Sequence, residues 1–243
     1  MTKEGVSKYK IRIQTMKQII ISFLVLLSSA NGWAQNYVVK QQKAIVDDYI
    51  ALMNFARYEA FSFDVSSLID STRVFEIIFR EFERDSMVTE QSFFSTENRK
   101  MLSVFDETDQ KKIHDEGSAF DEAKGIYKVA QKLIVGFLPI ENDSTERVFL
   151  NIENMARGAY CLHLKPAVNT KTGETLLEYN CVPYKITEFE FNKFIPLVMY
   201  GSFWYDEEYD FFRFCGEQEI DPNEGASMQK YMPHYYIVGM VVR

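Results

Sequence analysis

The first half of the chain carries apolar residues at three- and four-residue spacing, the pattern of amphipathic helices. Over residues 41–61 one such stripe predicts a helix; it contains Ile45, Tyr49, Leu52, Met53, Ala56 and Ala60. A second helix is predicted over residues 72–84, where Glu76 and Arg80 stand four apart and can pair. A third is predicted over residues 95–113, with its many charged residues on a solvated face.

After Gly125 the apolar positions alternate, which indicates strands. Alternation predicts strands over residues 127–137, ended by Pro139, and over residues 148–152. Further strands are predicted over residues 158–165, 174–182, 209–215 and 235–242. The last of these is almost entirely apolar, so we expect a central strand covered on both faces.

Residues 187–201 leave two interpretations open. Thr187 and Glu190 fit the capping box of a helix, whereas Phe189 and Phe191 alternate as in a strand, and Pro196 would break a long helix.

The order of these elements predicts the fold class. Helices over residues 40–115, followed by strands over residues 125–243, indicate an α+β domain. We expect the N-terminal helices to pack on a curved, largely antiparallel sheet formed by the C-terminal half. No linker or repeat marks a boundary, so residues 35–243 are predicted to form a single domain.

An apolar run near the N-terminus predicts export. Lys17 precedes an apolar stretch over residues 19–27, and the small residues Gly32 and Ala34 supply a cleavage site, the pattern of a secretory signal peptide. The stretch is far shorter than the roughly 20 residues of a membrane-spanning helix. We therefore predict cleavage after Ala34 and a periplasmic or extracellular protein without stable membrane insertion. No Cys follows the run to take a lipid anchor.

The segment before the signal has two interpretations. Residues 1–15 are polar and basic, which is either an extended start of the signal peptide or a leader created by a misassigned start. Because Met16 and Lys17 alone satisfy the requirement for a charged start, Met16 is the favoured first residue.

Charge excludes some partners. The whole chain has a formal net charge of −8. Residues 1–34 contain five Lys or Arg and one Glu, so residues 35–243 keep 22 basic and 34 acidic side chains, a net charge of −12. A polyanionic surface repels phosphate backbones and anionic membranes, and no basic stripe offsets it, so we expect no nucleic-acid partner.

The three cysteines are Cys161, Cys181 and Cys215. Residues 169–173 suit a hairpin loop, and symmetric pairing about Lys171 would place Cys161 opposite Cys181. Export permits a disulfide between them, whereas a shifted register or buried reduced thiols are the alternatives. Cys161 and His163 could share one strand face and bind a metal, but no second pair completes such a site, so no metal or cofactor is predicted.

The densest candidate for a recognition surface is the aromatic and acidic segment over residues 202–210. Its candidate ligand-binding residues are Trp204, Tyr205, Asp206 and Glu208. Aromatic faces beside carboxylates suit sugar rings or cationic groups. The competing interpretation is a core aromatic beside a solvated acidic turn.

The sequence therefore favours an exported, non-catalytic binding or accessory protein whose ligand or envelope partner is unknown. One alternative is a secreted hydrolase with a dispersed Cys/His or carboxylate site, in which Cys215 could be the nucleophile. Another is a structural component of the cell envelope. No Gly-x-Ser-x-Gly or phosphate-binding glycine motif supports an enzyme.

Overall fold

The computed structural model describes residues 53, 58–69, 71–138, 144–186, 189–214, 216, 218–222 and 229–243. Within them, 54% of residues lie in strands and 9% are helical. The predicted signal peptide and most of the first predicted helix lie outside the described residues.

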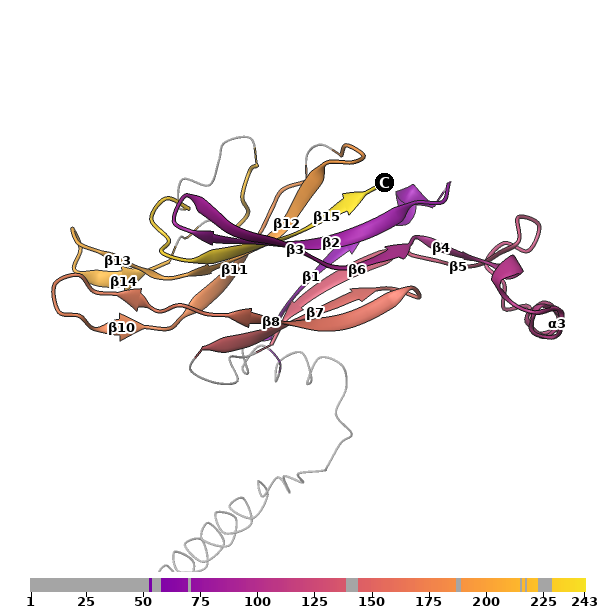
Figure 1. Cartoon of the computed structure of the whole chain (residues 1–243), viewed down its shortest axis with the longest axis horizontal. Coiled ribbons are helices and arrows are strands. Elements are labelled where there is room, and N and C mark those ends of the chain that lie inside the picture. Colours follow the sequence, from indigo (N-terminus) through magenta and orange to yellow (C-terminus); the bar gives the residue numbers. More distant parts are fainter. Residues whose placement is uncertain are drawn as a thin grey trace, which may run out of the picture. The chain divides into compact units, whose positions relative to one another are not determined.

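Two antiparallel sheets make up the architecture (Figure 1). The four-stranded sheet has the order β1-β6-β7-β8; its strands are β1 (Glu59–Asp64), β6 (Lys132–Phe137), β7 (Thr145–Ile152) and β8 (Ala156–His163). The five-stranded sheet has the order β11-β12-β15-β2-β3; its strands are β2 (Val74–Glu83), β3 (Ser86–Glu97), β11 (Tyr179–Pro183), β12 (Phe194–Ser202) and β15 (Tyr235–Val242).

Three two-stranded ribbons complete the sheet structure. They pair β4 (Arg99–Met101) with β5 (Ile126–Val129), β9 (Ala167–Val168) with β10 (Thr175–Leu176), and β13 (Trp204–Asp206) with β14 (Phe211–Arg213). The helical elements are the 3-10 turns η1 (Ser66–Leu68) and η2 (Leu102–Val104) and the helix α3 (Glu107–Asp115). Asp106 caps α3 by accepting the Asp109 N–H at 2.9 Å.

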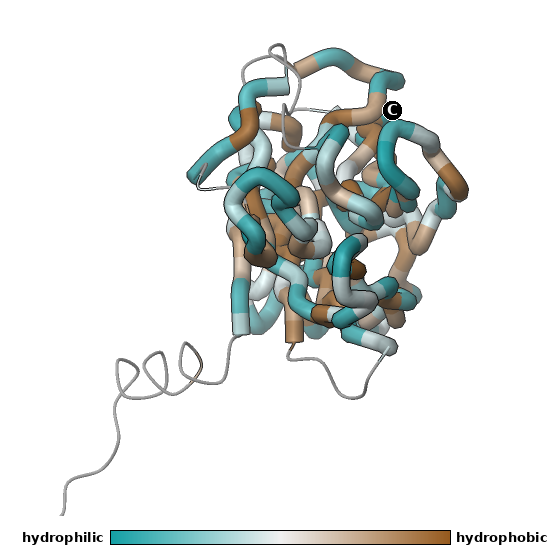
Figure 2. Tube along the Cα trace, turned by 90° about the vertical axis from the view of Figure 1, so that its left-hand side faces the viewer, coloured by the Kyte–Doolittle hydropathy of each residue, from teal (hydrophilic) through white to brown (hydrophobic). Residues whose placement is uncertain are grey.

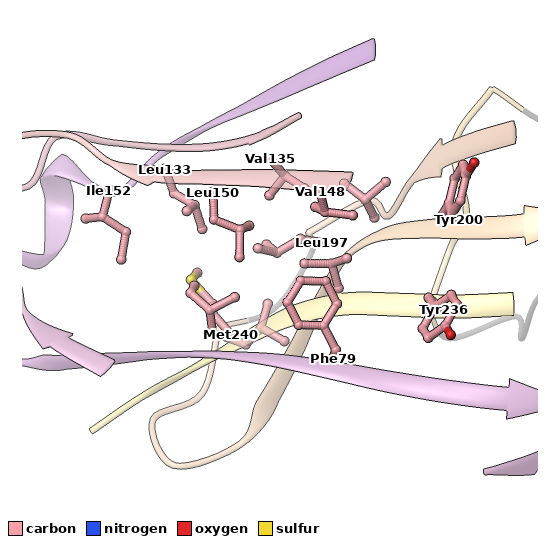
Figure 3. Close-up of a cluster of buried hydrophobic side chains, with 14 of the residues drawn as sticks. Phe79, Leu133, Val135, Val148, Leu150, Ile152, Leu197, Tyr200, Tyr236 and Met240 are labelled. Atoms are coloured by element: carbon pink, nitrogen blue, oxygen red, sulfur yellow. The ribbon is translucent and has the colours of Figure 1, made fainter. Parts of the chain in front are cut away.

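The main core lies between the two sheets. Strand β7 alternates buried and outward residues, so Val148, Leu150 and Ile152 face the five-stranded sheet. They meet Phe79, Leu197 and Met240 from that sheet, as Figure 3 shows. Hydrophobic stretches lie in the interior of the stacked strands, whereas hydrophilic residues lie mostly at the turns (Figure 2).

A second core covers the outer face of the five-stranded sheet. Tyr235 and Ile237 point to this side of β15 and pack with residues from the segments after β11 and β14. The cluster contains Val182, Tyr184, Met199, Trp204, Ile220, Met232, Tyr235 and Ile237. All eight residues of β15 are buried, so the expectation of a central strand covered on both faces is confirmed.

The predicted α+β architecture is wrong. Residues 72–84 are predicted as a helix, but residues 74–83 form β2, and residues 59–61 of the first predicted helix belong to β1. Within residues 95–113 the chain completes β3, forms β4 and the 3-10 turn η2, and becomes α-helical only in α3. Among the described residues, α3 is the single α-helix with assigned bounds. The predicted group of N-terminal helices packed on one sheet is therefore not found in this part of the chain. The fold is a sandwich of two antiparallel sheets.

The predicted pairing around Lys171 is also wrong. Residues 169–173 do form a turn, but it joins only the short ribbon β9–β10. Cys161 on β8 pairs with Arg147 of the four-stranded sheet, whereas Cys181 on β11 pairs with Tyr200 of the five-stranded sheet. Both cysteines are free thiols. The register fails because the chain leaves one sheet at β8 and enters the other at β11.

Candidate functional site

The hairpin β13–β14 contains the segment that the sequence singles out for recognition. Its strands pair Trp204 with Arg213 and Asp206 with Phe211. Asp206 closes the turn, because its Oδ1 accepts the N–H of Glu208 at 3.0 Å and that of Tyr209 at 3.3 Å. These bonds and Arg213 outweigh the opposing effect of burial and lower the pKa of Asp206.

Trp204 does not present its face to solvent. Its side chain is 9% exposed and belongs to the second core. Tyr231 stacks on it with ring centroids 6.0 Å apart, and Phe214 packs at 6.4 Å. Trp204 therefore anchors the hairpin to the five-stranded sheet, and the competing interpretation of a core aromatic beside an acidic turn describes this residue.

Two other aromatic side chains of the hairpin are exposed. Tyr209 is 60% exposed and Phe211 is 50% exposed, with ring centroids 6.3 Å apart. Glu208, which precedes Tyr209 in the sequence, is also exposed. Tyr205 and Asp206 are half-buried. The structure thus brings Tyr205, Asp206 and Glu208 together on one hairpin, with Tyr209 and Phe211 as the rings available for contact.

The hairpin is tied to the turn between β9 and β10. Lys171 Nζ lies 3.1 Å from Asp210 Oδ1 and 3.1 Å from the Glu207 carbonyl oxygen. The Tyr205 hydroxyl donates to the same Asp210 carboxylate, and the Thr170 hydroxyl donates to Glu207 at 2.6 Å. The hydrogen bonds from Tyr205 and Lys171 lower the pKa of Asp210.

A buried polar layer lies at one end of the main core. Figure 3 shows Tyr200 and Tyr236 at the end of the apolar cluster. The Tyr200 hydroxyl donates to Glu146, which occupies a buried position in the alternating pattern of β7. The Tyr236 hydroxyl donates to the carbonyl of His163 at 2.9 Å.

A carboxylate, an imidazole and a phenol form a line in the same layer. Glu81 Oε1 lies 3.0 Å from His234 Nε2, and His234 Nδ1 lies 2.6 Å from the Tyr179 hydroxyl. Burial raises the pKa of Tyr179 far above its ordinary value, which keeps the phenol protonated. These three groups therefore form a hydrogen-bonded chain in which His234 can take up a proton. The protonated Tyr179 does not supply an activated phenolate nucleophile.

The other residues considered from the sequence do not join this layer as a catalytic group. Cys161 and His163 are both exposed, on the same face of β8 as predicted. Among the described residues, no three His, Cys, Asp or Glu side chains gather as metal ligands would. Burial raises the pKa of Cys181, which disfavours a reactive thiolate. Cys215 lies outside the described residues.

Sequence reasoning missed Glu81, Glu146, Tyr179 and His234. Glu146 could have been found, because it occupies the same phase of the alternation as Val148 and Leu150. Glu81 could not have been found, because its segment is predicted as a helix, and a helical pattern does not show which residues of a strand point into the core.

The fold and the exposed hairpin define a β-sandwich protein with an aromatic turn on one ribbon. Residues 27–243 match the family described as Domain of unknown function (DUF5041), and the chain belongs to that family. No curated protein and no solved structure matches the chain. In the part of the chain that the structure describes, every helix is too short or too polar to cross a membrane.

Proposed function

We propose that this protein is an exported, non-catalytic binding protein that recognises its ligand with the turn of the β13–β14 hairpin. The proposal rests chiefly on the exposure of Tyr209 and Phe211, at 60% and 50%, in adjoining positions. Aromatic side chains offer a large contact area at a small cost in conformational entropy, which suits recognition. The signal-like residues 16–34 support the export part of the proposal.

The anchoring of the hairpin supports a preformed surface. Trp204 fixes one side of the ribbon in the second core, and Lys171 joins its turn to the neighbouring loop through Asp210. Arg213 of β14 forms an ion pair with Asp206 of β13 at 2.9 Å, which links the two strands of the hairpin. A surface held in this way loses little freedom on binding, so more of the contact energy appears as affinity.

The charge of the hairpin indicates the class of ligand. Its turn carries four carboxylates, and two of them are paired with Lys171 and Arg213; the four are Asp206, Glu207, Glu208 and Asp210. The net negative charge disfavours anionic ligands. Ring faces beside carboxylates suit an uncharged sugar or a group with a positive charge.

Screening followed by mutation tests the proposal. Residues 35–243 would be applied to a glycan array and to an array of basic peptides, and the strongest hit would be titrated. We expect the double variant Tyr209→Ala/Phe211→Ala to weaken binding about tenfold or more, a change of about 1.4 kcal/mol. Phe120→Ala is the matched control, because Phe120 is a similarly exposed aromatic residue outside the hairpin. Unchanged affinity in the double variant, or an equal loss in the control, contradicts the proposal.

A further inference from the structure

His234 is a buried imidazole with hydrogen-bond partners on both ring nitrogens. It directly precedes β15, and its side chain is 1% exposed. Nε2 faces Glu81 Oε1 from β2 at 3.0 Å, and Nδ1 faces the hydroxyl of Tyr179 from β11 at 2.6 Å. Strands β2 and β11 and the residue before β15 therefore bring a carboxylate, an imidazole and a phenol into one hydrogen-bonded chain.

The Tyr179 hydroxyl has two partners besides His234. The backbone N–H of Lys165 donates to it at 2.9 Å, and the Lys165 carbonyl oxygen lies 3.0 Å from it. A phenol has a single proton to donate. The hydroxyl therefore donates either to His234 Nδ1 or to the Lys165 carbonyl, but not to both at once.

These contacts satisfy the neutral imidazole. When Nε2 carries the proton, it donates to Glu81, and Nδ1 accepts from the Tyr179 hydroxyl. In the other neutral tautomer the proton is on Nδ1. The unprotonated Nε2 would then face the Glu81 carboxylate, and two acceptors would lie against each other with no proton between them. The neutral state is therefore the Nε2–H tautomer.

The same contacts also satisfy the imidazolium. A second proton on Nδ1 is donated to the Tyr179 oxygen, and the phenolic proton turns to the Lys165 carbonyl. The Nε2–H group still donates to Glu81, which remains ionised as the counterion. Both ring nitrogens of His234 therefore keep a hydrogen-bond partner in either state, although the side chain is only 1% exposed. The group that gains or loses the phenolic hydrogen bond is the carbonyl of Lys165, an exposed residue.

We propose that His234 is a buried proton-binding site and that the Tyr179 hydroxyl turns from His234 to the Lys165 carbonyl when the proton binds. The incoming proton comes from solvent and forms the Nδ1–H bond. No bond to the phenolic proton breaks, because that proton changes its direction and not its oxygen.

The surrounding charges set the range in which the site titrates. Burial lowers the pKa of His234, and Glu81 opposes this effect. Lys165, which is ion-paired with Glu83, acts in the lowering direction, and Glu83 acts in the raising direction. Among the described residues, the remaining titratable group against the ring is Tyr236, whose centroid lies 5.0 Å from that of His234. Protonation is thus expected below the ordinary pKa of about 6.5.

The site lies at the base of the β13–β14 hairpin. The His234 N–H donates to Ser202 Oγ at 3.3 Å, and the Ser202 N–H donates to the His234 carbonyl at 2.9 Å. The N–H of Phe203 donates to the carbonyl of Glu178, next to Tyr179.

The proton site goes beyond the proposed function, since it requires no ligand at the hairpin.

Nuclear magnetic resonance of the histidine rings in residues 35–243 tests the proposal. In the wild type at pH 8, the ¹⁵N shifts are expected to show the Nε2–H tautomer of His234; an Nδ1–H tautomer would overturn the assignment. Tyr179→Phe removes the partner of Nδ1 in both states, and the loss costs more for the charged ring than for the neutral ring, so we expect the titration midpoint of His234 to fall by about one pH unit or more. The signals of the exposed His114 ring serve as the internal reference.

Two outcomes of the titration oppose the proposal. One is a His234 midpoint that is the same in Tyr179→Phe as in the wild type. The other is a wild-type ring that stays neutral down to the pH of acid unfolding. If Tyr179→Phe does not fold, the wild-type tautomer and the wild-type midpoint still decide the matter. Neither readout involves the hairpin ligand, so failure here is separate from failure of the proposed function.

Discussion

The Tyr200 hydroxyl donates a hydrogen bond to the Glu146 carboxylate between the two sheets of the sandwich. Tyr200 comes from β12 and Glu146 from β7, so the contact joins opposite layers. Burial raises the pKa of Glu146 from 4.5 to about 7, the hydrogen bond from Tyr200 opposes the rise, and the charge of Glu59 adds to it. The charge of this buried carboxyl group therefore changes near neutral pH.

The raised pKa of Glu146 predicts that stability falls as the pH rises. Because the folded state binds this proton more tightly than the unfolded chain, its contribution is fully present below about pH 4.5. It is lost progressively up to about pH 7, at an upper limit of about 3 kcal/mol. Glu146→Gln stays neutral, so its free energy of unfolding should increasingly exceed that of the wild type over this range. Urea unfolding at pH 5, 6 and 7.5 measures the difference, and parallel curves for the two proteins would contradict it.

Gly239 on β15 is predicted to tolerate no side chain. A Cβ atom there would lie 2.6 Å from the Ile195 carbonyl oxygen and would overlap the Phe194 ring. The Arg80 guanidinium covers that ring at 3.7 Å from its centroid, which limits its movement. Gly239→Ala should therefore lower the free energy of unfolding by about 1–3 kcal/mol.

Gly136 provides the matched control for this substitution. It is also a strand glycine, but a Cβ atom there would meet nothing closer than the Glu59 carbonyl oxygen at 3.7 Å. Gly136→Ala should leave stability unchanged or raise it slightly, because alanine restricts the unfolded chain. Equal effects of the two substitutions in chemical denaturation would show that the crowding at Gly239 is relieved by repacking.

The fold shows why periodicity failed in β2 and succeeded in β15. Both strands are apolar on two faces, since a second core covers the outside of their sheet. In β2 the outward Ile78 and Phe82 add to the inward Phe75 and Phe79, so the apolar set also fits helical spacing. In β15 the run of seven apolar residues, interrupted only by Gly239, was too short to favour a helix, and the predicted elements before it were already strands.

The candidate site was predictable only in part. The hairpin segment and its acidic turn follow from composition, but the choice between Trp204 and Tyr209 as the exposed ring depends on what covers each. Tyr231 and Phe214 cover Trp204 from distant positions in the chain, and a single sequence does not reveal such contacts. The hydrogen-bonded chain Glu81–His234–Tyr179 depends on β2, β11 and the residue before β15, and the pairing order of these strands is not sequential. Spacing along the chain therefore carries no signal for it.

Asn98 is predicted to be a structural residue despite its polar side chain. It is fully buried, its Oδ1 accepts the Arg73 N–H at 2.9 Å, and its Nδ2 donates to the Ser71 carbonyl at 3.0 Å. Asn98→Ala removes these hydrogen bonds from a fully buried position, so we expect a loss of about 1–3 kcal/mol in the free energy of unfolding. Asn151→Ala on β7, at a partly exposed position, should change it by less than about 0.5 kcal/mol. Thermal or urea unfolding of both variants checks the contrast.

Trp204 and Tyr209 lie on the same hairpin and are predicted to respond to substitution in opposite ways. Trp204→Ala removes a buried ring from the second core and should cost about 3–5 kcal/mol of stability. Tyr209→Ala removes an exposed ring and should change stability by less than about 0.5 kcal/mol while weakening ligand binding. Denaturation and binding must therefore be measured on the same preparations. A stable Trp204→Ala protein that loses only binding would return Trp204 to the recognition surface and remove the basis for assigning that role to Tyr209.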